Sequence, residues 1–159
     1  MTTPAQTVAG SAFRAILWGA IMTGTFDLVF AFIFYGLKIG VLQSIAAGLL
    51  GSGPARQGGI PTAILGIVLH FLIAAIWAGI FWIASRRLPF LIRHFVAAGL
   101  AYGLIVFYGM NSMVLPLSAM HAKAWPPPFA LWPVAMHMLI VGLPIAWATR
   151  HFSRPSAAT

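Results

Sequence analysis

Few residues of this 159-residue chain could do chemistry, and most of them lie inside long apolar stretches. Asp27 is the only acidic residue, while His70, Tyr102 and His137 each lie near the middle of a later apolar stretch. A carboxylate and imidazoles at such positions can exchange a proton or satisfy one another by hydrogen bonds. Two histidines on separate helices can also ligate a haem iron.

Composition excludes several other kinds of chemistry. The chain has no cysteine, which removes disulfides, thiolate metal sites and thiol catalysis. A single carboxylate excludes paired-carboxylate catalysis within one chain. No HExxH, GxSxG or phosphate-binding glycine loop is present in the sequence. We therefore predict a non-enzymatic protein with no metal site and no resident cofactor, with haem b as an alternative.

The composition is that of a membrane protein. Hydrophobic residues make up 61% of the chain and charged residues only 6%, against about 25% charged in ordinary soluble domains. The net charge of +8 comes from nine Lys and Arg residues scattered between apolar stretches. Scattered basic residues are typical topology signals, whereas nucleic-acid binding needs a dense basic patch. The sequence therefore predicts a lipid bilayer, and no nucleic acid, as the partner.

Four apolar stretches are long enough to cross a bilayer, which takes about 20 residues. The predicted fold is an all-α, integral membrane four-helix bundle over residues 13–150, with cytoplasmic tails at 1–12 and 151–159. Pro144 lies inside the last span, lacks a backbone N–H and predicts a kink there. The expected spans cover about 13–37, 61–85, 90–115 and 129–149.

The connections between the spans are apolar and rich in turn residues. Apolar residues recur at helical spacing over Ile39–Leu50, which predicts an amphipathic helix in the interface or packed against the bundle. A re-entrant segment is the alternative. The loop from Pro116 to Pro128 contains Trp125, which with Trp132 is typical of an interfacial aromatic anchor.

Basic residues are distributed unequally between the two ends of the predicted bundle. The end that holds the termini has six arginines and the other end has three basic residues, so the positive-inside rule predicts cytoplasmic termini. The six are Arg14, Arg86, Arg87, Arg93, Arg150 and Arg154, and the three are Lys38, Arg56 and Lys123.

Small residues recur at three- and four-residue steps on each span, which favours close helix packing in lipid. Asp27 and His70 fall on two of these faces, so we expect both side chains to point inward and to lie close together. The faces are Ala20, Gly24, Asp27 and Ala31; Gly66, His70, Ala74 and Ala78; Gly99 and Gly103; and Gly142 and Ala146.

Three hypotheses describe the intramembrane polar residues. In the first, Asp27 accepts hydrogen bonds from His70, Tyr102 or Thr25 and forms a structural polar core. In the second, Asp27 and a histidine exchange a proton across a wet cavity. In the third, His70 and His137 are the axial ligands of a b-type haem.

Asn111 lies near the outer end of the third span, five residues before Pro116. Asn and Ser close to a proline commonly end helices, so we expect the helix to end there. The alternative is a polar lining at the mouth of a cavity.

Five segments of the chain resemble small four-span inner-membrane proteins of proteobacteria. The resemblance covers about residues 13–150 and implies a bacterial inner-membrane location but no activity. The segments are Phe26-Asp27-Leu28, Phe34-Tyr35-Gly36, Leu42 to Ala46, Leu69-His70-Phe71 and Met110 to Pro116.

The functional prediction is a non-enzymatic inner-membrane protein that acts as a small subunit or accessory protein of a membrane complex, or as a homo-oligomer. A small transporter or proton-relay protein using Asp27 and His70 is the first alternative. A haem protein with His70 and His137 as ligands is the second.

Overall fold

The computed structural model describes residues 4–121 and 131–153, with side chains from Ser11 onward. All regular structure in these two ranges is helical, and four helical runs are long and apolar enough to cross a membrane. The all-α four-helix fold expected from the sequence is therefore confirmed. The four spans are Ser11–Tyr35, Gly59–Arg87, Phe95–Leu117 and Leu131–Ser153.

The third and fourth spans are each built from three consecutive helical elements, and the first two spans are single α-helices. In chain order the elements are α1 (Pro4–Tyr35), α2 (Ile39–Leu50), α3 (Ser52–Gln57), α4 (Gly59–Arg87), α5 (Phe90–Arg93), α6 (Phe95–Gly109), η1 (Met110–Val114), α7 (Leu115–Leu117), α8 (Leu131–Met136), η2 (His137–Gly142) and α9 (Leu143–Ser153).

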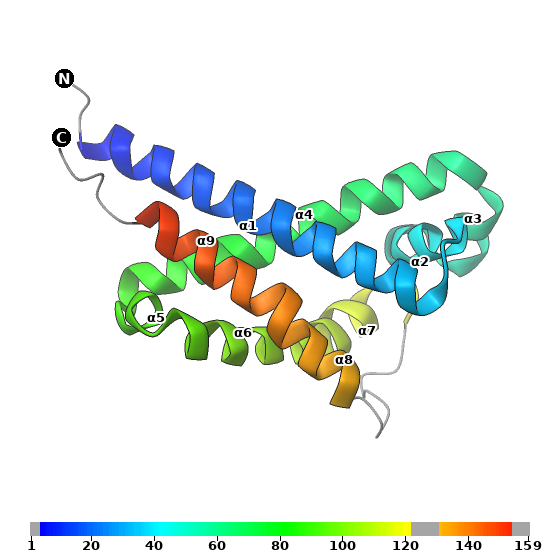
Figure 1. Ribbon diagram of the computed structural model, residues 1–159. Coiled ribbons are helices and arrows are strands. Elements are labelled where there is room, and N and C mark those ends of the chain that lie inside the picture. The colour runs from blue at the N-terminus through cyan, green and yellow to red at the C-terminus, as the bar shows by residue number, and fades with distance from the viewer. Residues whose placement is uncertain (1–3, 122–130, 154–159) are drawn as a thin grey trace.

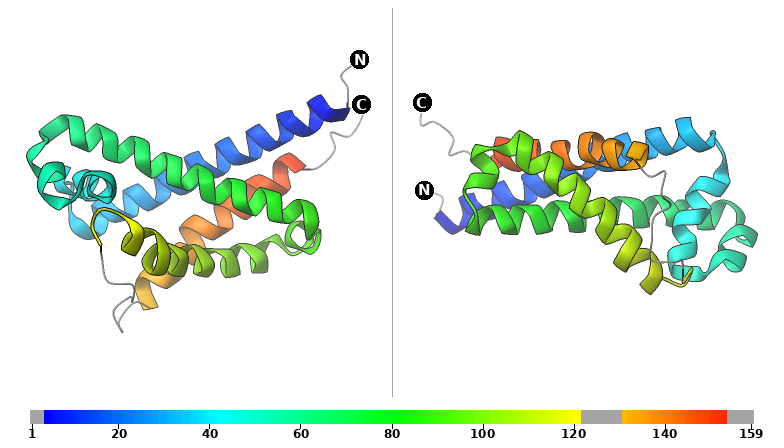
Figure 2. Two further views of the ribbon diagram at one scale, coloured as in Figure 1. Left: turned by 180° about the vertical axis from the view of Figure 1, so that it is seen from behind. Right: turned by 90° about the horizontal axis from the view of Figure 1, so that it is seen from below.

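The start of α1 and the end of α9 lie at the same end of the bundle, as an even number of spans requires (Figure 1). Helices α2, α3 and α7 lie at the opposite end. Helix α1 packs against α4 and α9, and α6 packs against η2 and α9. The views in Figure 2 show α2 running across the ends of the long helices rather than along them.

The helix boundaries differ most from those expected at the start of α1 and at the start of the third span. Helix α1 begins at Pro4, inside the segment expected to be a tail, because a helix can continue beyond the hydrocarbon layer. The third span begins at Phe95 rather than at residue 90, since His94 breaks the helix with φ −111° and ψ 45°. Arg93 and His94 therefore lie at a corner between α5 and α6.

Helix α2 packs against the bundle, in agreement with one of the two placements expected for an amphipathic helix. Its backbone at Leu42 approaches Gly66 of α4 so closely that a Cβ at Gly66 would collide with the Leu42 carbonyl. Gln43, Ala46 and Ala47 are its buried residues. The expected interfacial anchor Trp125 lies outside the described residues, and Trp132 is exposed.

Small residues form the tightest interfaces, as the stripes in the sequence predicted. The backbones of Gly99 and Gly103 in α6 touch that of Gly142 in η2, so a Cβ at any of the three would meet a neighbouring backbone. Gly19 of α1 faces the side chain of Ala78 in α4, with 3.2 Å between an added Cβ and the Ala78 Cβ. Close backbone approach provides dispersion contacts that lipid cannot replace.

The largest fully buried side chains lie in the half of the bundle nearer the termini. Phe81 of α4 is 1% exposed, and Ile145 and Ala146 of α9 are fully buried. At the middle of the first span, Thr23 donates a 3.1 Å hydrogen bond to the Val141 carbonyl oxygen, which ties this span to the last one. This half of the bundle is closed.

Each of the last two spans changes to π-helix before a proline. Before Pro144, where the sequence predicts a kink, η2 covers His137–Gly142 immediately ahead of α9. Likewise η1 covers Met110–Val114 before Pro116. Because proline cannot donate the usual backbone hydrogen bond, local π-helical turns can accommodate it inside a span. Such turns are frequent at functional sites.

Candidate functional site

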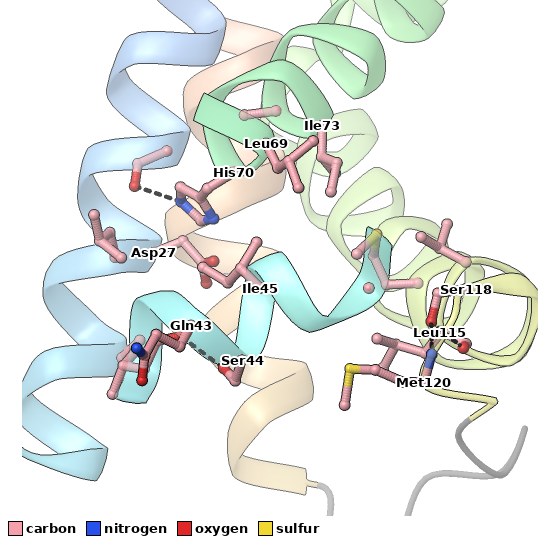
Figure 3. Close-up of a pocket in the computed structure, with 18 of the residues that line it drawn as sticks. Asp27, Gln43, Ser44, Ile45, Leu69, His70, Ile73, Leu115, Ser118 and Met120 are labelled. Carbon is pink, nitrogen blue, oxygen red and sulfur yellow. Dashed lines mark hydrogen bonds between the residues drawn. The ribbon is translucent and has the colours of Figure 1, made fainter. Parts of the chain in front are cut away.

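A cavity of about 1110 Å³ lies in the half of the bundle away from the termini. Its walls come from α1, α2, α4 and the two π-helical segments, and most of the lining is apolar. Figure 3 shows Ile45, Leu69, Ile73, Leu115 and Met120 around it. We call it the Asp27 cavity.

Asp27 lies on α1, is half-buried, and points into this cavity (Figure 3). Within the described parts of the chain, no hydrogen bond or ion pair engages its carboxylate. The only acidic group of the protein is therefore left to interact with whatever fills the cavity.

His70 of α4 faces α1 on the same wall of the cavity. Its Nε2 atom lies 2.9 Å from the carbonyl oxygen of Gly24, one turn before Asp27. A carbonyl oxygen can only accept, so Nε2 carries a hydrogen and Nδ1 of the neutral ring keeps a lone pair. The structure thus brings Asp27 and His70 to the lining of one cavity, but the imidazole bonds to backbone rather than to the carboxylate.

His137 also lines the cavity, from the fourth span. It is the first residue of η2, and its Nδ1 atom lies 2.9 Å from the carbonyl oxygen of Pro133. Its ring packs edge-on against Phe107 at 5.1 Å between centroids. The tautomer is therefore the opposite of that at His70, because here Nδ1 carries the hydrogen.

Tyr102 and Asn111 are not part of this cavity. The Tyr102 hydroxyl donates a 2.7 Å hydrogen bond to the Trp77 carbonyl oxygen, and its ring packs at 4.8 Å from that of Phe81. Asn111 Nδ2 donates to the Phe107 carbonyl oxygen at 2.8 Å within a helical run that continues to Leu117.

These contacts correct two expectations. The Tyr102 hydroxyl donates to a backbone carbonyl oxygen, and Thr25 is exposed, so neither residue supplies the expected hydrogen bond to Asp27. The helix also does not end at Asn111, because η1 and α7 carry it past Pro116.

Gln43 of α2 is a lining residue that the sequence analysis missed. Its Nε2 donates to the carbonyl oxygens of Arg56 at 3.3 Å and Gly59 at 3.1 Å, which fastens α2 to the α3–α4 corner. The available signal was a lone amide within the apolar helix Ile39–Leu50. Lys38 and Arg56 add two basic side chains to the lining of the same cavity.

No group of three histidine or acidic side chains lies close enough to hold a metal ion in residues 4–121 and 131–153. His137 could ligate a haem iron through Nε2, because its hydrogen bond uses Nδ1. His70 would have to ligate the iron through Nδ1 or break the hydrogen bond from its Nε2 to the Gly24 carbonyl oxygen. Haem ligation by this pair stays a prediction, and the presence or absence of a Soret band in the visible spectrum of the purified protein tests it.

No protein-family model, curated protein or solved structure matches the chain. No family is assigned. The structure has the four-span architecture of the proteobacterial proteins that the sequence resembles.

Proposed function

We propose that this protein is a small proton-translocating transporter of a bacterial inner membrane, with both termini in the cytoplasm. Asp27 is the proton-binding group and His70 its exchange partner. The Asp27 cavity then opens toward the outer face, because it lies at the end of the bundle away from the termini. Its apolar lining also suits a mainly apolar solute, but proton translocation through the cavity does not require one.

The unpartnered carboxylate of Asp27 is the observation that carries this proposal. An acidic side chain in the middle of a span costs about 2.5–3.5 kcal/mol on insertion scales. A purely structural residue would offset this cost with protein hydrogen bonds. Asp27 has none among the described residues, so water or solute in the cavity is left to satisfy it.

The shape of the bundle also supports transport. One half encloses the Asp27 cavity, whereas the other half is sealed by Phe81, Ile145 and glycine backbones in direct contact. A transporter needs a site that is open to one side of the membrane and closed to the other. Met110 of η1 and His137 of η2 both line the cavity, so a change in either π turn would alter its wall.

Proton flux into vesicles tests the proposal. The purified chain is reconstituted with a pH-sensitive dye inside, and a potassium diffusion potential drives proton entry. We expect wild-type vesicles to acidify faster than protein-free vesicles, and Asp27→Asn to remove the difference. His70→Gln should slow acidification, while His121→Gln should not, since His121 is an exposed histidine outside the cavity.

The same variants separate transport from a structural or accessory role. Thermal melting of the purified Asp27→Asn variant in detergent shows whether it still folds. If wild-type vesicles acidify no faster than protein-free ones, or if folded Asp27→Asn retains the full rate, proton translocation is excluded. A loss of thermal stability without any effect on flux would favour the structural polar core, and co-purification of other subunits would favour an accessory protein.

A further inference from the structure

A second, shallower hollow lies at the end of the bundle that holds the termini. It has a volume of about 370 Å³ and is lined by residues around the α5–α6 corner and by the last turns of α9. Three of its lining residues are basic, namely Arg93, His94 and Arg150. It is separate from the Asp27 cavity, with which it shares no lining residue.

The backbone break at His94 creates this hollow. Because α5 ends at Arg93 and α6 begins at Phe95, the two basic residues lie at a corner instead of on a continuous helix. Arg150 approaches from α9, and its guanidinium carbon lies 4.5 Å above the centre of the Phe95 ring. A cation–π contact of this kind fixes the position of the charge.

The basic side chains of the hollow have no acidic side chain to neutralise them. Asp27 is the only acidic residue of the chain, and it lines the other cavity. Two guanidinium groups around one hollow repel each other unless an anion lies between them. Arginine binds phosphate through paired N–H donors, so phosphate is the anion that these groups fit best.

The position of the hollow relative to the membrane surface indicates which phosphate-bearing molecule can reach it. The third span begins at Phe95 and the fourth ends at Ser153, so Arg93 and Arg150 lie where apolar helix meets the membrane surface. Val96, which is 49% exposed, and Leu100 continue the lining with apolar surface on the membrane side. A phospholipid can place its phosphate on the arginines and its acyl chains along these side chains.

We infer that the hollow formed by Arg93, His94 and Arg150 is a binding site for the headgroup of an anionic phospholipid such as phosphatidylglycerol. The site is independent of the Asp27 cavity and of proton translocation. Its occupant holds the α5–α6 corner against α9 and neutralises charge that the chain itself cannot.

Native mass spectrometry of the detergent-purified full chain, titrated with phosphatidylglycerol, tests this inference. We expect the dissociation constant of the first lipid to rise about thirtyfold in Arg93→Gln/Arg150→Gln, as two basic contacts at a membrane surface are worth roughly that factor. The matched control is Arg86→Gln/Arg87→Gln, which removes the same charge at the same end of the bundle but outside the hollow. The control should bind as the wild type does.

Three results would overturn the site. The first is an equal loss of affinity in both double variants, which would indicate a general surface attraction. The second is equal affinity for phosphatidylcholine, whose headgroup has no net charge. The third is inorganic phosphate stabilising the protein against heating as well as phosphatidylglycerol does, with the same dependence on Arg93 and Arg150. Arg150→Lys keeps the charge and should retain part of the affinity if the protein folds.

Discussion

The Nε2 atom of His70 lies 2.9 Å from the carbonyl oxygen of Gly24, one helical turn before Asp27. This contact joins α4 to α1 and holds the ring on the cavity wall without using the carboxylate. The arrangement leaves two proton acceptors in one cavity, the Asp27 carboxylate and the Nδ1 atom of His70. A hydrogen bond between them would instead have tied both groups to each other.

Nitrogen NMR of protein labelled at histidine checks this arrangement directly. At about pH 8, above the usual titration range of histidine, we expect His70 to be the Nε2–H tautomer and His137 to be the Nδ1–H tautomer. The reason is that the backbone carbonyl oxygens of Gly24 and Pro133 accept from these different ring nitrogens. Spectra of His70→Gln and His137→Gln assign the signals, and an Nδ1–H form at His70 would contradict the contact with Gly24.

Cysteine labelling tests whether the cavity admits water. The natural chain has no cysteine, so single-cysteine variants react without background. We expect a charged, membrane-impermeant thiol reagent to modify Ile73→Cys, because Ile73 lines the Asp27 cavity. Ala78→Cys is the matched control on the same helix, since Ala78 is 1% exposed in the closed half.

The labelling result also bears on orientation. Reagent added outside intact cells should modify Ile73→Cys if the cavity opens toward the outer face, and only lysed cells should react if it opens inward. Equal protection of both cysteines in purified protein would mean that the cavity is dry.

Gly142→Ala should destabilise the bundle far more than Gly79→Ala. A Cβ at Gly142 would collide with the backbones of Gly99 and Gly103, whereas one at Gly79 meets nothing closer than Ile16 Cδ1 at 3.9 Å. Overpacking of this kind costs about 1–3 kcal/mol. Thermal melting in detergent measures the difference, and equal melting temperatures for the two variants would show that the α6–η2 contact is looser than the structure has it.

The sequence predicted the elements whose cause is local. Long apolar stretches require spanning helices, and small residues at four-residue steps require close packing, so the bundle and its buried faces followed from the residues alone. Asp27 and His70 lie on two of the predicted packing faces, and both line one cavity in the structure.

Features that depend on contacts between distant segments could not be predicted from these patterns. Nothing in the local sequence shows that Tyr102 bonds to the Trp77 carbonyl oxygen instead of Asp27, because that depends on how α4 and α6 are rotated. The role of Gln43 depends on how α2 meets the α3–α4 corner. The π turn before Pro116 carries the helix past the point at which proline alone predicts its end, and a second π turn precedes Pro144.

The contact between the backbones of Gly99 and Gly142 is a point about which α6 can rotate against the fourth span. Side chains at this point would interlock and resist rotation, whereas two glycines present smooth surfaces about which α6 can pivot against the fourth span. A small rotation of the third span at this point displaces its far end, at Met110, by the largest amount. The end near the termini hardly moves. Such a rotation widens or narrows the cavity and leaves the closed half unchanged.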